Sequence, residues 1–369
     1  MRKSLPIITA LAIIAVLPWH DALAAYKFSQ FKARTPIHIY GISSAAPRGL
    51  TPQIIKQAYN LPANGGRGTI AIIGAYNDQT IESDLSIFSK QFGLADCTSR
   101  NGCFEKHLMQ TNTGTNSGWA LETSLDVEWA HAIAPNAKIL LVAAKTPSGP
   151  NLLGAIDYAR NRSDVVAISM SWGGAESPDQ VGLDSHLTSS HIAFFASSGD
   201  SGYGVSWPAA SKNVVAVGGT SLRLGAGGGL QAETAWAGSG GGVSAYEGES
   251  TWQKTYSIPK ANGHRAVPDV SYNADPASGF SVYKTTGKSK NNWYVLGGTS
   301  AGAPQWAAIH ALGLSALPAN LYSDKASANN GNYFRDIVSG ANGDCPYYCN
   351  ARARYDYVTG LGSPLTVRF

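Results

Sequence analysis

Short runs of apolar and β-branched residues recur along the chain, and more polar segments with helical patterns separate them. A strand that is buried on both faces has such a continuous apolar run, whereas a strand with one exposed face alternates. The pattern therefore predicts an α/β fold with a mainly parallel sheet that is covered by helices on both faces. The five runs are TIAIIGA (69–75), AKILLVAA (137–144), DVVAISM (164–170), HIAFFAS (191–197) and NVVAVGG (213–219).

One segment, GWALETSLDVEWAHAIAP, has the period of an amphipathic helix. Leu121, Leu125, Trp129 and Ile133 recur at four-residue intervals and form an apolar stripe. The pattern stops near Pro135, because proline cannot continue a helix. The spacing therefore predicts a helix that ends close to this proline.

Length and composition fit one large domain. The chain has 369 residues, 44% of them apolar, which is enough to bury a large α/β core. Residues 222–263 are rich in Gly, Ser and Trp, so we expect loops and short antiparallel strands there. Only 14% of the residues are charged, and a surface with few carboxylates loses less stability when these become protonated. The composition is therefore compatible with acidic surroundings.

The formal net charge of +4 raises the question of an anionic partner. Lysine and arginine are scattered along the chain, and no basic run is long enough to follow a phosphate backbone. This distribution argues against nucleic acid as a partner.

The N-terminus has the pattern of a secretory signal. Arg2 and Lys3 precede an apolar run over 5–17, and Ala22-Leu23-Ala24 supplies small residues for cleavage before Ala25. A membrane helix is the alternative, but the run is shorter than the roughly 20 residues that a span requires. We therefore expect a signal peptide over 1–24, export from the cytoplasm to the periplasm or the exterior, and no membrane anchor.

The four cysteines form two close pairs. Cys97 and Cys103 flank a short turn, and Cys345 and Cys349 bracket Pro-Tyr-Tyr. In an exported protein, two local disulfides are the economical pairing. Metal binding is the competing interpretation, although no His or Cys cluster completes a tetrahedral set.

The segment LGGTSAGAP (296–304) contains the strongest candidate for a nucleophile. Ser300 follows two glycines and precedes small residues that lead into a helical pattern. A serine at the mouth of a helix has an exposed hydroxyl and backbone N–H groups nearby, as a nucleophile requires. The alternative is that the small residues only pack a helix start against a strand.

A serine nucleophile needs a base. No histidine lies in a motif that presents a catalytic imidazole, and His131 and His310 have helical settings typical of core or surface residues. Glu122 and Asp126 are four residues apart on the predicted helix, so both carboxyls share one face. Two acids this close do not both ionise easily, so we expect the pair to hold a proton and titrate as a unit. The alternative is a solvated, charged helix face.

Asp200 follows one of the apolar runs, in SGDSG (198–202). This places it at a strand end, where parallel α/β sheets carry functional loops. An Asp donates a hydrogen bond to an oxyanion only while it is protonated, so such a role would demand low pH. The alternative is a simple turn with a tolerant Asp.

Taken together, these segments resemble the sedolisin family of serine-carboxyl peptidases, and their order and spacing match over roughly residues 50–369. The resemblance implies a subtilisin-like doubly wound sheet and secreted, monomeric endopeptidase activity on proteins or peptides in acid, through an acyl-enzyme. The segments are ExxxD in the helix, SWGG (171–174), SGDSG, PAASKNVVAVGGTS (208–221), RAVPDVSYNADPASG (265–279) and GGTSAGAP.

The resemblance also implies roles for individual residues. Ser300 would be the nucleophile and Glu122 its general base. Asp126 would orient Glu122 and share its proton, and Asp200 would be the oxyanion donor. The residues in the position of the substrate cleft are Ser171, Trp172, Gly173 and Gly174.

The segments FRDIVSGANG and ARARYDYVTGLGSP resemble the two halves of the family's calcium loop, and oxygen ligands suit a hard cation. Asp336 and Asp356 would bind one Ca²⁺ through side chains, and Ile337, Arg352 and Arg354 through main-chain carbonyls. Relatives commonly have Gly at the two arginine positions, and two cations beside the site would weaken binding. The alternative is a pair of solvated loop aspartates.

Two features depart from the family pattern. About twenty-five residues (25–49) separate the predicted cleavage point from the start of the peptidase-like domain (50–369), where relatives carry a long propeptide. Gly74 stands where relatives often place an acid that supports the catalytic pair. These departures keep open a catalytically weak peptide-binding homologue. A neutral-pH subtilisin-type enzyme would need a His in place of Glu122.

Overall fold

The computed structural model of the protein describes residues 28, 30–287, 289, 291–323 and 333–365. Its centre is an eight-stranded sheet. The strands of this sheet are β2 (Thr69–Ala75), β3 (Phe104–Leu108), β4 (Lys138–Ala144), β5 (Val165–Met170), β7 (Ala193–Ser197), β9 (Val214–Leu224), β10 (Leu230–Ala235) and β13 (Val270–Asn273).

The strands lie in the order β10-β9-β7-β5-β2-β4-β3, and β13 pairs with β9 off this path. All of these pairs are parallel except β10 with β9. β2 therefore lies between β5 and β4. On one side of β2 the chain adds β4 and β3, and on the other side it adds β5, β7 and β9. This confirms the predicted doubly wound, mainly parallel sheet.

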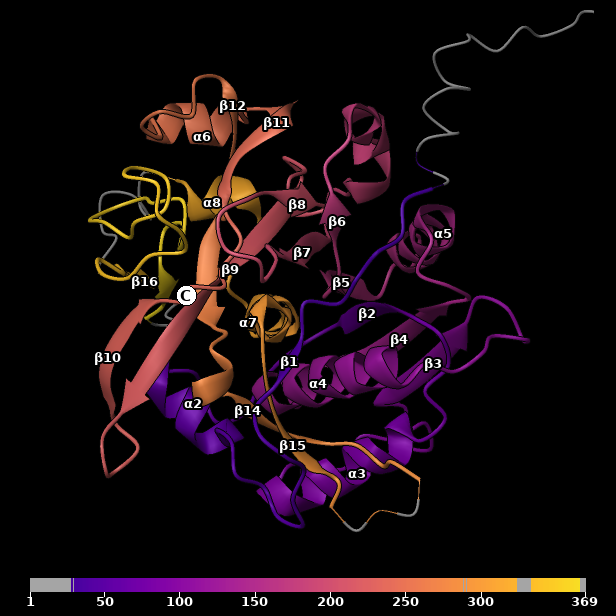
Figure 1. The fold of residues 1–369 in the computed structure, drawn as a ribbon. Coiled ribbons are helices and arrows are strands. Elements are labelled where there is room, and N and C mark those ends of the chain that lie inside the picture. The colour runs from indigo at the N-terminus through magenta and orange to yellow at the C-terminus, as the bar shows by residue number, and fades with distance from the viewer. Residues whose placement is uncertain (1–27, 29, 288, 290, 324–332, 366–369) are drawn as a thin grey trace, which may run out of the picture.

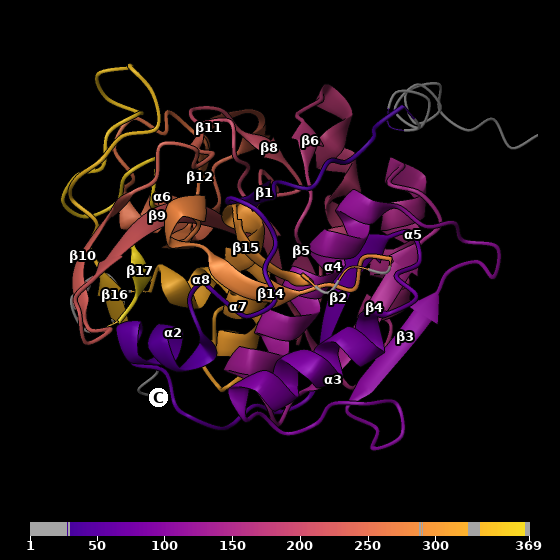
Figure 2. The same cartoon turned by 60° about the horizontal axis from the view of Figure 1, so that its bottom comes forward.

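Helices cover both faces of the sheet (Figures 1 and 2). On one face, α4 (Ser117–Ile133) contacts β2, α7 (Gly302–Ala311) contacts β5 and β7, and α3 (Ile81–Phe92) packs on α4. On the other face, α5 (Gly149–Arg160) contacts β4, β2 and β5. The sheet is therefore the middle layer of three.

The alternation of side chains along β2 explains the two cores. Ile70 and Ile72 belong to the core under α4 and α7, whereas Ala71 and Ile73 belong to the core under α5. Because successive side chains of a strand point to opposite faces, both faces of β2 must be apolar. This is why the run is continuous in the sequence, and all seven residues of β2 are buried.

Helix α4 begins and ends where its sequence predicts. The side chain of Asn116 caps the first turn by accepting a hydrogen bond from the Trp119 N–H at 3.1 Å. The helix ends at Ile133, and Ala134 and Pro135 follow. One expectation was too narrow: every residue from Leu121 to Ile133 is buried, not only one stripe, because α3 and α7 also pack on α4.

Smaller elements surround this framework. A three-stranded sheet has the order β1-β15-β14, and its strands are antiparallel. The elements are β1 (His38–Ile39), β6 (Gly174–Ala175), β8 (Ser206–Trp207), β11 (Gly242–Gly248), β12 (His264–Val267), β14 (Phe280–Tyr283), β15 (Trp293–Gly297), β16 (Phe334–Arg335), β17 (Ser363–Pro364), α2 (Pro52–Ala58), α6 (Thr251–Tyr256), α8 (Pro318–Leu321), and the 3-10 helices η1 (Pro178–Leu187), η2 (Pro276–Ser278) and η3 (Thr299–Ala301).

The region 222–263 contains β10 and β11, which form antiparallel pairs as expected. It also contains the short helix α6, which the composition did not predict. Within the described residues, no helix is long and apolar enough to cross a bilayer. The predicted signal peptide over 1–24 lies outside the described residues. The chain from residue 30 onward runs between β6 and α5 to β1 (Figure 1, indigo).

Both predicted disulfides are present. Cys97 pairs with Cys103, and Cys345 pairs with Cys349. The Nε2 atom of His131 lies near the first pair but is 2.9 Å from the carbonyl oxygen of Ala95. Because both sulfurs of that pair are already bonded to each other, they are not available as thiolate ligands for a metal.

Candidate active site

Ser300 lies at the start of the helical segment that follows β15. Gly298 precedes it with φ +116°, a conformation that favours glycine. Residues 299–301 form η3, and α7 continues from Gly302. The Ser300 side chain is fully buried, and its hydroxyl has no hydrogen-bond partner among the described residues. The expected position at the mouth of a helix is therefore observed, with an enclosed rather than an exposed hydroxyl.

Glu122 and Asp126 lie one turn apart on α4, each with 2% of its surface exposed. They do not form a solvated face. Asp126 Oδ1 accepts a hydrogen bond from the Ser171 hydroxyl at 2.7 Å, and the same hydroxyl is 3.1 Å from the Ser300 carbonyl oxygen. Neither carboxylate oxygen of Glu122 accepts a hydrogen bond from any of the described residues, so this carboxyl is free to exchange a proton with a hydroxyl that faces it.

Burial raises the pKa of Glu122 well above its ordinary value, and the neighbouring Asp126 charge raises it further. The neighbouring Ser300 hydroxyl opposes this shift in pKa, although the two side chains do not form a hydrogen bond of good geometry in this structure. Burial also raises the pKa of Asp126, and the Ser171 hydroxyl opposes that shift. The two acids therefore favour a shared proton over two charges.

Asp200 follows β7 at the carboxyl edge of the sheet. Its Oδ1 accepts two hydrogen bonds from Thr299, one from the backbone N–H at 2.8 Å and one from the hydroxyl at 2.7 Å. Its Oδ2 lies 3.1 Å from Nε2 of His38. Burial raises the pKa of Asp200, while His38 and Thr299 oppose the shift. One oxygen is thus fixed by Thr299, and the other faces the cleft.

The segment SWGG follows β5 and approaches the same edge. Ser171 contacts Asp126, as described above, and Trp172 is fully buried with its indole N–H donating to the Ile73 carbonyl oxygen at 2.9 Å. Gly173 and Gly174 line a cavity of about 440 Å³. Ser171 and Trp172 are therefore buried beneath the site and hold it in place, whereas Gly173 and Gly174 face the cleft.

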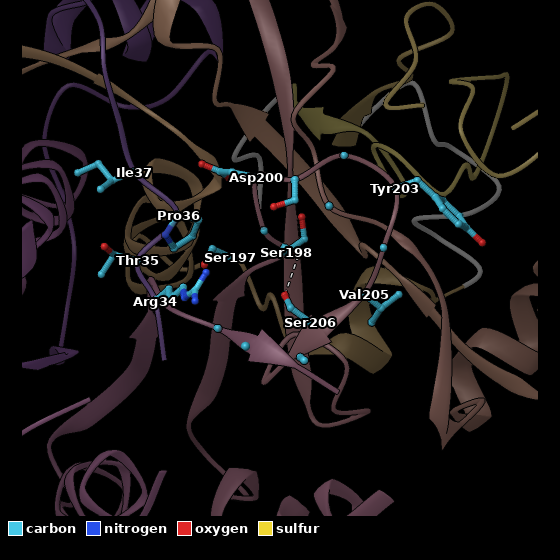
Figure 3. Close-up of a pocket in the computed structure, with 18 of the residues that line it drawn as sticks. Arg34, Thr35, Pro36, Ile37, Ser197, Ser198, Asp200, Tyr203, Val205 and Ser206 are labelled. Atoms are coloured by element: carbon cyan, nitrogen blue, oxygen red, sulfur yellow. Dashed lines mark hydrogen bonds between the residues drawn. The ribbon is translucent and has the colours of Figure 1, made fainter. Parts of the chain in front are cut away.

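The cavity extends from Gly173 to Asp200, and Figure 3 shows the side chains around it. Its other wall is formed by residues 34–38, upstream of the predicted peptidase domain. His38 touches Asp200 directly. The sequence analysis missed this histidine, and only its place in an extended, non-periodic segment distinguishes it from the other histidines.

The two other histidines that were singled out lie apart from this arrangement. His131 is buried in α4 with its ring nitrogen at the Ala95 carbonyl. His310 accepts a hydrogen bond from the Ala316 N–H through Nδ1 at 3.1 Å, and burial lowers its pKa to about 4. A neutral, enclosed imidazole in this setting is a core residue.

The loops around Asp336 and Asp356 are the candidate site for a calcium ion. Oδ1 of Asp336 is buried without a partner, while its Oδ2 accepts the Arg354 N–H at 2.8 Å. Asp356 accepts hydrogen bonds from several backbone N–H groups, including that of Arg352 at 3.2 Å. Burial raises the pKa of Asp356 to about 6. The unpartnered Oδ1 of Asp336 is an oxygen of the kind that a hard cation binds, whereas both oxygens of Asp356 accept hydrogen bonds in this structure.

The two arginines of this loop are accommodated in different ways. The guanidinium of Arg352 lies 3.9 Å from the ring centroid of Tyr347 and donates to its carbonyl oxygen at 2.6 Å. This contact holds its charge against the aromatic ring. Arg354 has φ +68°, the left-handed conformation that glycine adopts at lowest cost.

Gly74 lies in β2 beside α4. A Cβ atom added there would lie 3.6 Å from Oγ1 of Thr123, in ordinary van der Waals contact. The backbone therefore leaves room for the first atom of a side chain next to the helix that carries Glu122.

Comparison with known proteins is consistent with this geometry. The profile of the subtilase family (Peptidase_S8) matches residues 109–332, so the chain belongs to the subtilase family. The structure of a Pseudomonas sedolisin, described as a serine-carboxyl proteinase complexed with two molecules of pseudo-iodotyrostatin, is similar with a TM-score of 0.74 and 26% identity. That match covers 86% of this chain and 96% of the sedolisin chain.

Sequence relatives identify the subgroup. Kumamolisin from Bacillus sp. (strain MN-32) is 33% identical over 406 residues, covering 95% of this chain and 67% of kumamolisin. Sedolisin from Pseudomonas sp. (strain 101) is 28% identical over 320 residues, covering 73% of this chain and 53% of sedolisin. Within the subtilases, the chain is a serine peptidase of the sedolisin family, which confirms the resemblance seen in the sequence.

A more distant structure, a lanthipeptide protease, has a TM-score of 0.51 at 15% identity and covers 88% of this chain. At this identity the likeness shows the fold alone. The subtilisin-like fold therefore extends beyond the sedolisin relatives, whereas the acidic residues of the site must be argued from the chain itself.

Proposed function

We propose that the chain is a secreted endopeptidase that cleaves protein or peptide substrates in acid through an acyl-enzyme on Ser300. The observation that carries this proposal is the burial of Glu122 and Asp126 on one face of α4, with the Ser300 hydroxyl close to Glu122. A buried pair of acids with raised pKa values works as a base only where it holds one proton. Asp200 also has to be protonated before it can donate to an oxyanion, and this requirement is what places the proposed activity in acid.

In the proposed mechanism, Ser300 Oγ attacks the substrate carbonyl and Glu122 takes the hydroxyl proton. Asp126, held by the Ser171 hydroxyl, keeps a proton near Glu122 and limits the charge of the pair. Asp200 in its protonated form donates through Oδ2 to the oxyanion, because Oδ1 already accepts from Thr299. Glu122 then gives its proton to the leaving amine, and water releases the acyl group.

Substrate backbone would lie along Gly173 and Gly174, which line the cavity without side chains. In this structure Gly173 exchanges two backbone hydrogen bonds with Arg34, at 2.9 and 3.0 Å, which is the kind of pairing that an extended substrate would make there. The proposal extends to one Ca²⁺ held by Asp336, Asp356 and the carbonyls of Ile337, Arg352 and Arg354. This ion would tie the C-terminal loops together. The two disulfides support export, since such bonds persist in oxidising compartments.

The test is a pH–rate profile on an unstructured protein such as casein. We expect turnover between about pH 2 and 5, where carboxyl groups titrate. Ser300→Ala should lower kcat by about 10⁴-fold or more, and Glu122→Gln by about 10²- to 10⁴-fold, with the fold retained by circular dichroism.

A matched control is available on the same helix. Glu128 is also buried, and its carboxylate accepts the Tyr283 N–H at 3.0 Å, away from Ser300. Glu128→Gln keeps this acceptor and should retain near wild-type activity. Full activity of Glu122→Gln, or a rate that rises toward pH 8, would refute the carboxyl mechanism. Complete inactivity of the wild type at every pH would favour the peptide-binding alternative, for which the glycine at position 74 is the motivation.

A further inference from the structure

Asp200 lies in a turn whose own sequence does not make it rigid. Glycine loses more conformational freedom on folding than any other residue, so a turn that is built on glycines needs outside contacts to hold one shape. Thr299 fixes only one carboxylate oxygen of Asp200, so the direction of the other depends on how the turn is held. We call residues 199–204 the Asp200 turn, and its glycines, all with positive φ, are Gly199 (+111°), Gly202 (+73°) and Gly204 (+147°).

One set of contacts to the Asp200 turn comes from residues 238–241. Gly204 and Gly241 exchange two backbone hydrogen bonds, each at 2.8 Å, and the Gly202 N–H donates to the Gly238 carbonyl oxygen at 3.0 Å. Three of the four residues of this partner segment are themselves glycines. Two glycine-rich segments that pair with each other do not make a rigid support, so the pair needs a third element.

The third element is a hairpin close to the C-terminus, residues 340–351, which we call the disulfide hairpin. Within it the Asn342 N–H donates to the Cys349 carbonyl oxygen at 2.9 Å. The disulfide between Cys345 and Cys349 closes its tip. The disulfide hairpin therefore has a covalent closure, which the sequences of the Asp200 turn and of its partner segment do not allow.

Asn342, a buried residue, joins the disulfide hairpin to both glycine-rich segments. Its carbonyl oxygen accepts a hydrogen bond from the Tyr203 N–H at 2.9 Å, and its side-chain amide donates to the Ser239 carbonyl oxygen at 2.7 Å. A Cβ atom added to Gly202 would lie 2.6 Å from the same Asn342 carbonyl oxygen, so the Asp200 turn rests directly against this residue. One residue of the hairpin thus fixes the turn and its partner segment relative to each other.

The side chain of Tyr203 also contacts the tip of the disulfide hairpin. A Cβ atom added to Gly343 would lie 3.4 Å from Cβ of Tyr203 and 3.0 Å from Sγ of Cys349. The rings of Tyr203 and Tyr348 are 6.3 Å apart between centroids. Tyr203 and Asp200 both line the cavity, and Figure 3 shows the two on the same turn. Contacts therefore continue from the disulfide to the turn that carries Asp200.

We propose that the disulfide hairpin is a positioning element of the active site, which holds the Asp200 turn through Asn342 and so fixes the direction in which Asp200 donates to the oxyanion. This inference rests on the proposed function, because it assigns a support to the proposed oxyanion donor. The donated hydrogen bond has its full strength only in the transition state. A loosened turn should therefore lower kcat and leave KM almost unchanged.

The first experiment removes the disulfide that closes the hairpin, in the hairpin variant Cys345→Ala, Cys349→Ala. At the acid optimum its kcat on casein should fall about tenfold, a part of the roughly 10²- to 10³-fold cost of losing an oxyanion donor. Its KM should change by less than about twofold. Asn342→Ala, which leaves the disulfide intact, should lower kcat in the same way.

The matched control variant is Cys97→Ala, Cys103→Ala, at the other disulfide of the chain. The two cysteine pairs are 6 and 4 residues apart in the sequence, so each variant loses one short cross-link. The loss of stability should be similar, because both disulfides close short loops. The control variant should nevertheless keep the wild-type kcat, since its disulfide makes no contact with the Asp200 turn.

The second experiment asks whether the disulfide hairpin acts through Asp200. Asp200→Ala removes the donor, and kcat is measured for the wild type, the hairpin variant, Asp200→Ala and the combination. If the hairpin aims Asp200, its tenfold effect should shrink to less than about twofold in the Asp200→Ala chain. An effect that stays tenfold in that chain would overturn the proposal, because the hairpin would then act elsewhere.

The third experiment measures the support without turnover, in Ser300→Ala. Amide hydrogen exchange at Tyr203 should be slow in this chain and about tenfold faster or more when the hairpin substitutions are added, because the donor then loses a fixed acceptor. The Phe104 amide, which donates to the Thr98 carbonyl oxygen at 3.1 Å beside the other disulfide, should respond only to the control substitutions. Circular dichroism checks that all of these chains are folded.

The outcomes separate this inference from the proposed function. If the hairpin variant keeps both the wild-type kcat and the protection of Tyr203 while the wild type hydrolyses casein in acid, the positioning role is overturned and the peptidase stands. If the hairpin variant loses protection at Tyr203 but no chain hydrolyses casein at any pH, the support of the turn stands and the proposed activity fails. An equal fall of kcat in the hairpin and control variants would also overturn the positioning role, because the loss would not be specific to the Asp200 turn.

Discussion

Glu247 offers a measurement of how this fold responds to acid, away from the catalytic groups. It lies in β11, and its side chain is fully buried. Neither of its carboxylate oxygens has a hydrogen-bond partner among the described residues. Burial, and then the nearby charge of Asp184, raise its pKa to about 7. We expect that ionising Glu247 destabilises the native state.

The magnitude follows from linkage between protonation and folding. A native pKa of about 7 against an ordinary 4.5 is equivalent to ~3 kcal/mol at full strength, because each unit is worth about 1.4 kcal/mol. This figure already contains the compensation of the charge by Lys212 and Gln180. Relaxation of the native state around the charge and entry of water reduce it further. We therefore expect about 1–2 kcal/mol.

The sign is opposite to that of a salt-bridged acid. Because the native pKa of Glu247 is raised, the native state binds the proton more tightly than the unfolded chain does. Its contribution favours folding below pH 4.5 and is lost as the pH rises through about 7. Glu247→Gln, which carries no charge, should therefore unfold at higher urea concentration than the wild type at pH 7.5 and show little difference at pH 4.

The assay is urea unfolding followed by tryptophan fluorescence at both pH values, with Asp344→Asn as a control at an exposed carboxyl. The control should shift stability by less than about 0.5 kcal/mol at either pH. The reasoning fails if Glu247→Gln changes the free energy of unfolding by the same amount at pH 4 and pH 7.5, because the effect would then be packing alone.

Three further predictions concern other groups. Asp200→Asn should lower kcat by about 10²- to 10³-fold at the acid optimum, but its residual activity should persist to higher pH than that of the wild type, since an amide needs no proton to donate; kcat measured against pH tests this. Asp269→Ala should destabilise the fold by about 3–5 kcal/mol, because it leaves the fully buried Arg265 unpaired. Asp157→Asn, at the partly exposed pair with Arg160, should cost less than about 1 kcal/mol. Urea unfolding of both variants would test this difference. Calcium at about 100 times its Kd should stabilise the chain by about 2.7 kcal/mol. Asp336→Asn should abolish the shift in Tm that follows the addition or chelation of calcium. An equal shift in the variant would show that Asp336 is not a ligand of the ion.

The sheet and the helix α4 were predictable because their local and tertiary requirements agree. Strands buried on both faces need unbroken apolar runs, and β2 spans the predicted run over 69–75 without change. β9 is longer than its run over 213–219, because it extends to Leu224 to pair with β10. The alternating end of a strand that leaves the core does not have the same apolar signature.

The candidate site was predictable as a set of residues but not as an arrangement. The chain order of Glu122, Asp126, Asp200 and Ser300 indicated the family. Only the fold shows that Glu122, Asp126 and Ser300 are buried and that Asp200 borders the cleft. His38 could not be found in this way. Its segment has no helical or strand-like pattern of apolar residues. Its conformation depends on backbone pairing with Gly173 and with β15, which lie far away in the sequence.

The pairing of the N-terminal segment with β15 has a consequence for shortened versions of this protein. Beyond β1, Ser44 exchanges two backbone hydrogen bonds with Trp293, at 2.8 and 3.0 Å. A chain that starts after residue 44 would leave β15 as a bare outer strand with open donors and acceptors. We therefore expect such a truncation to associate edge to edge through β15 and to be less soluble than the full chain.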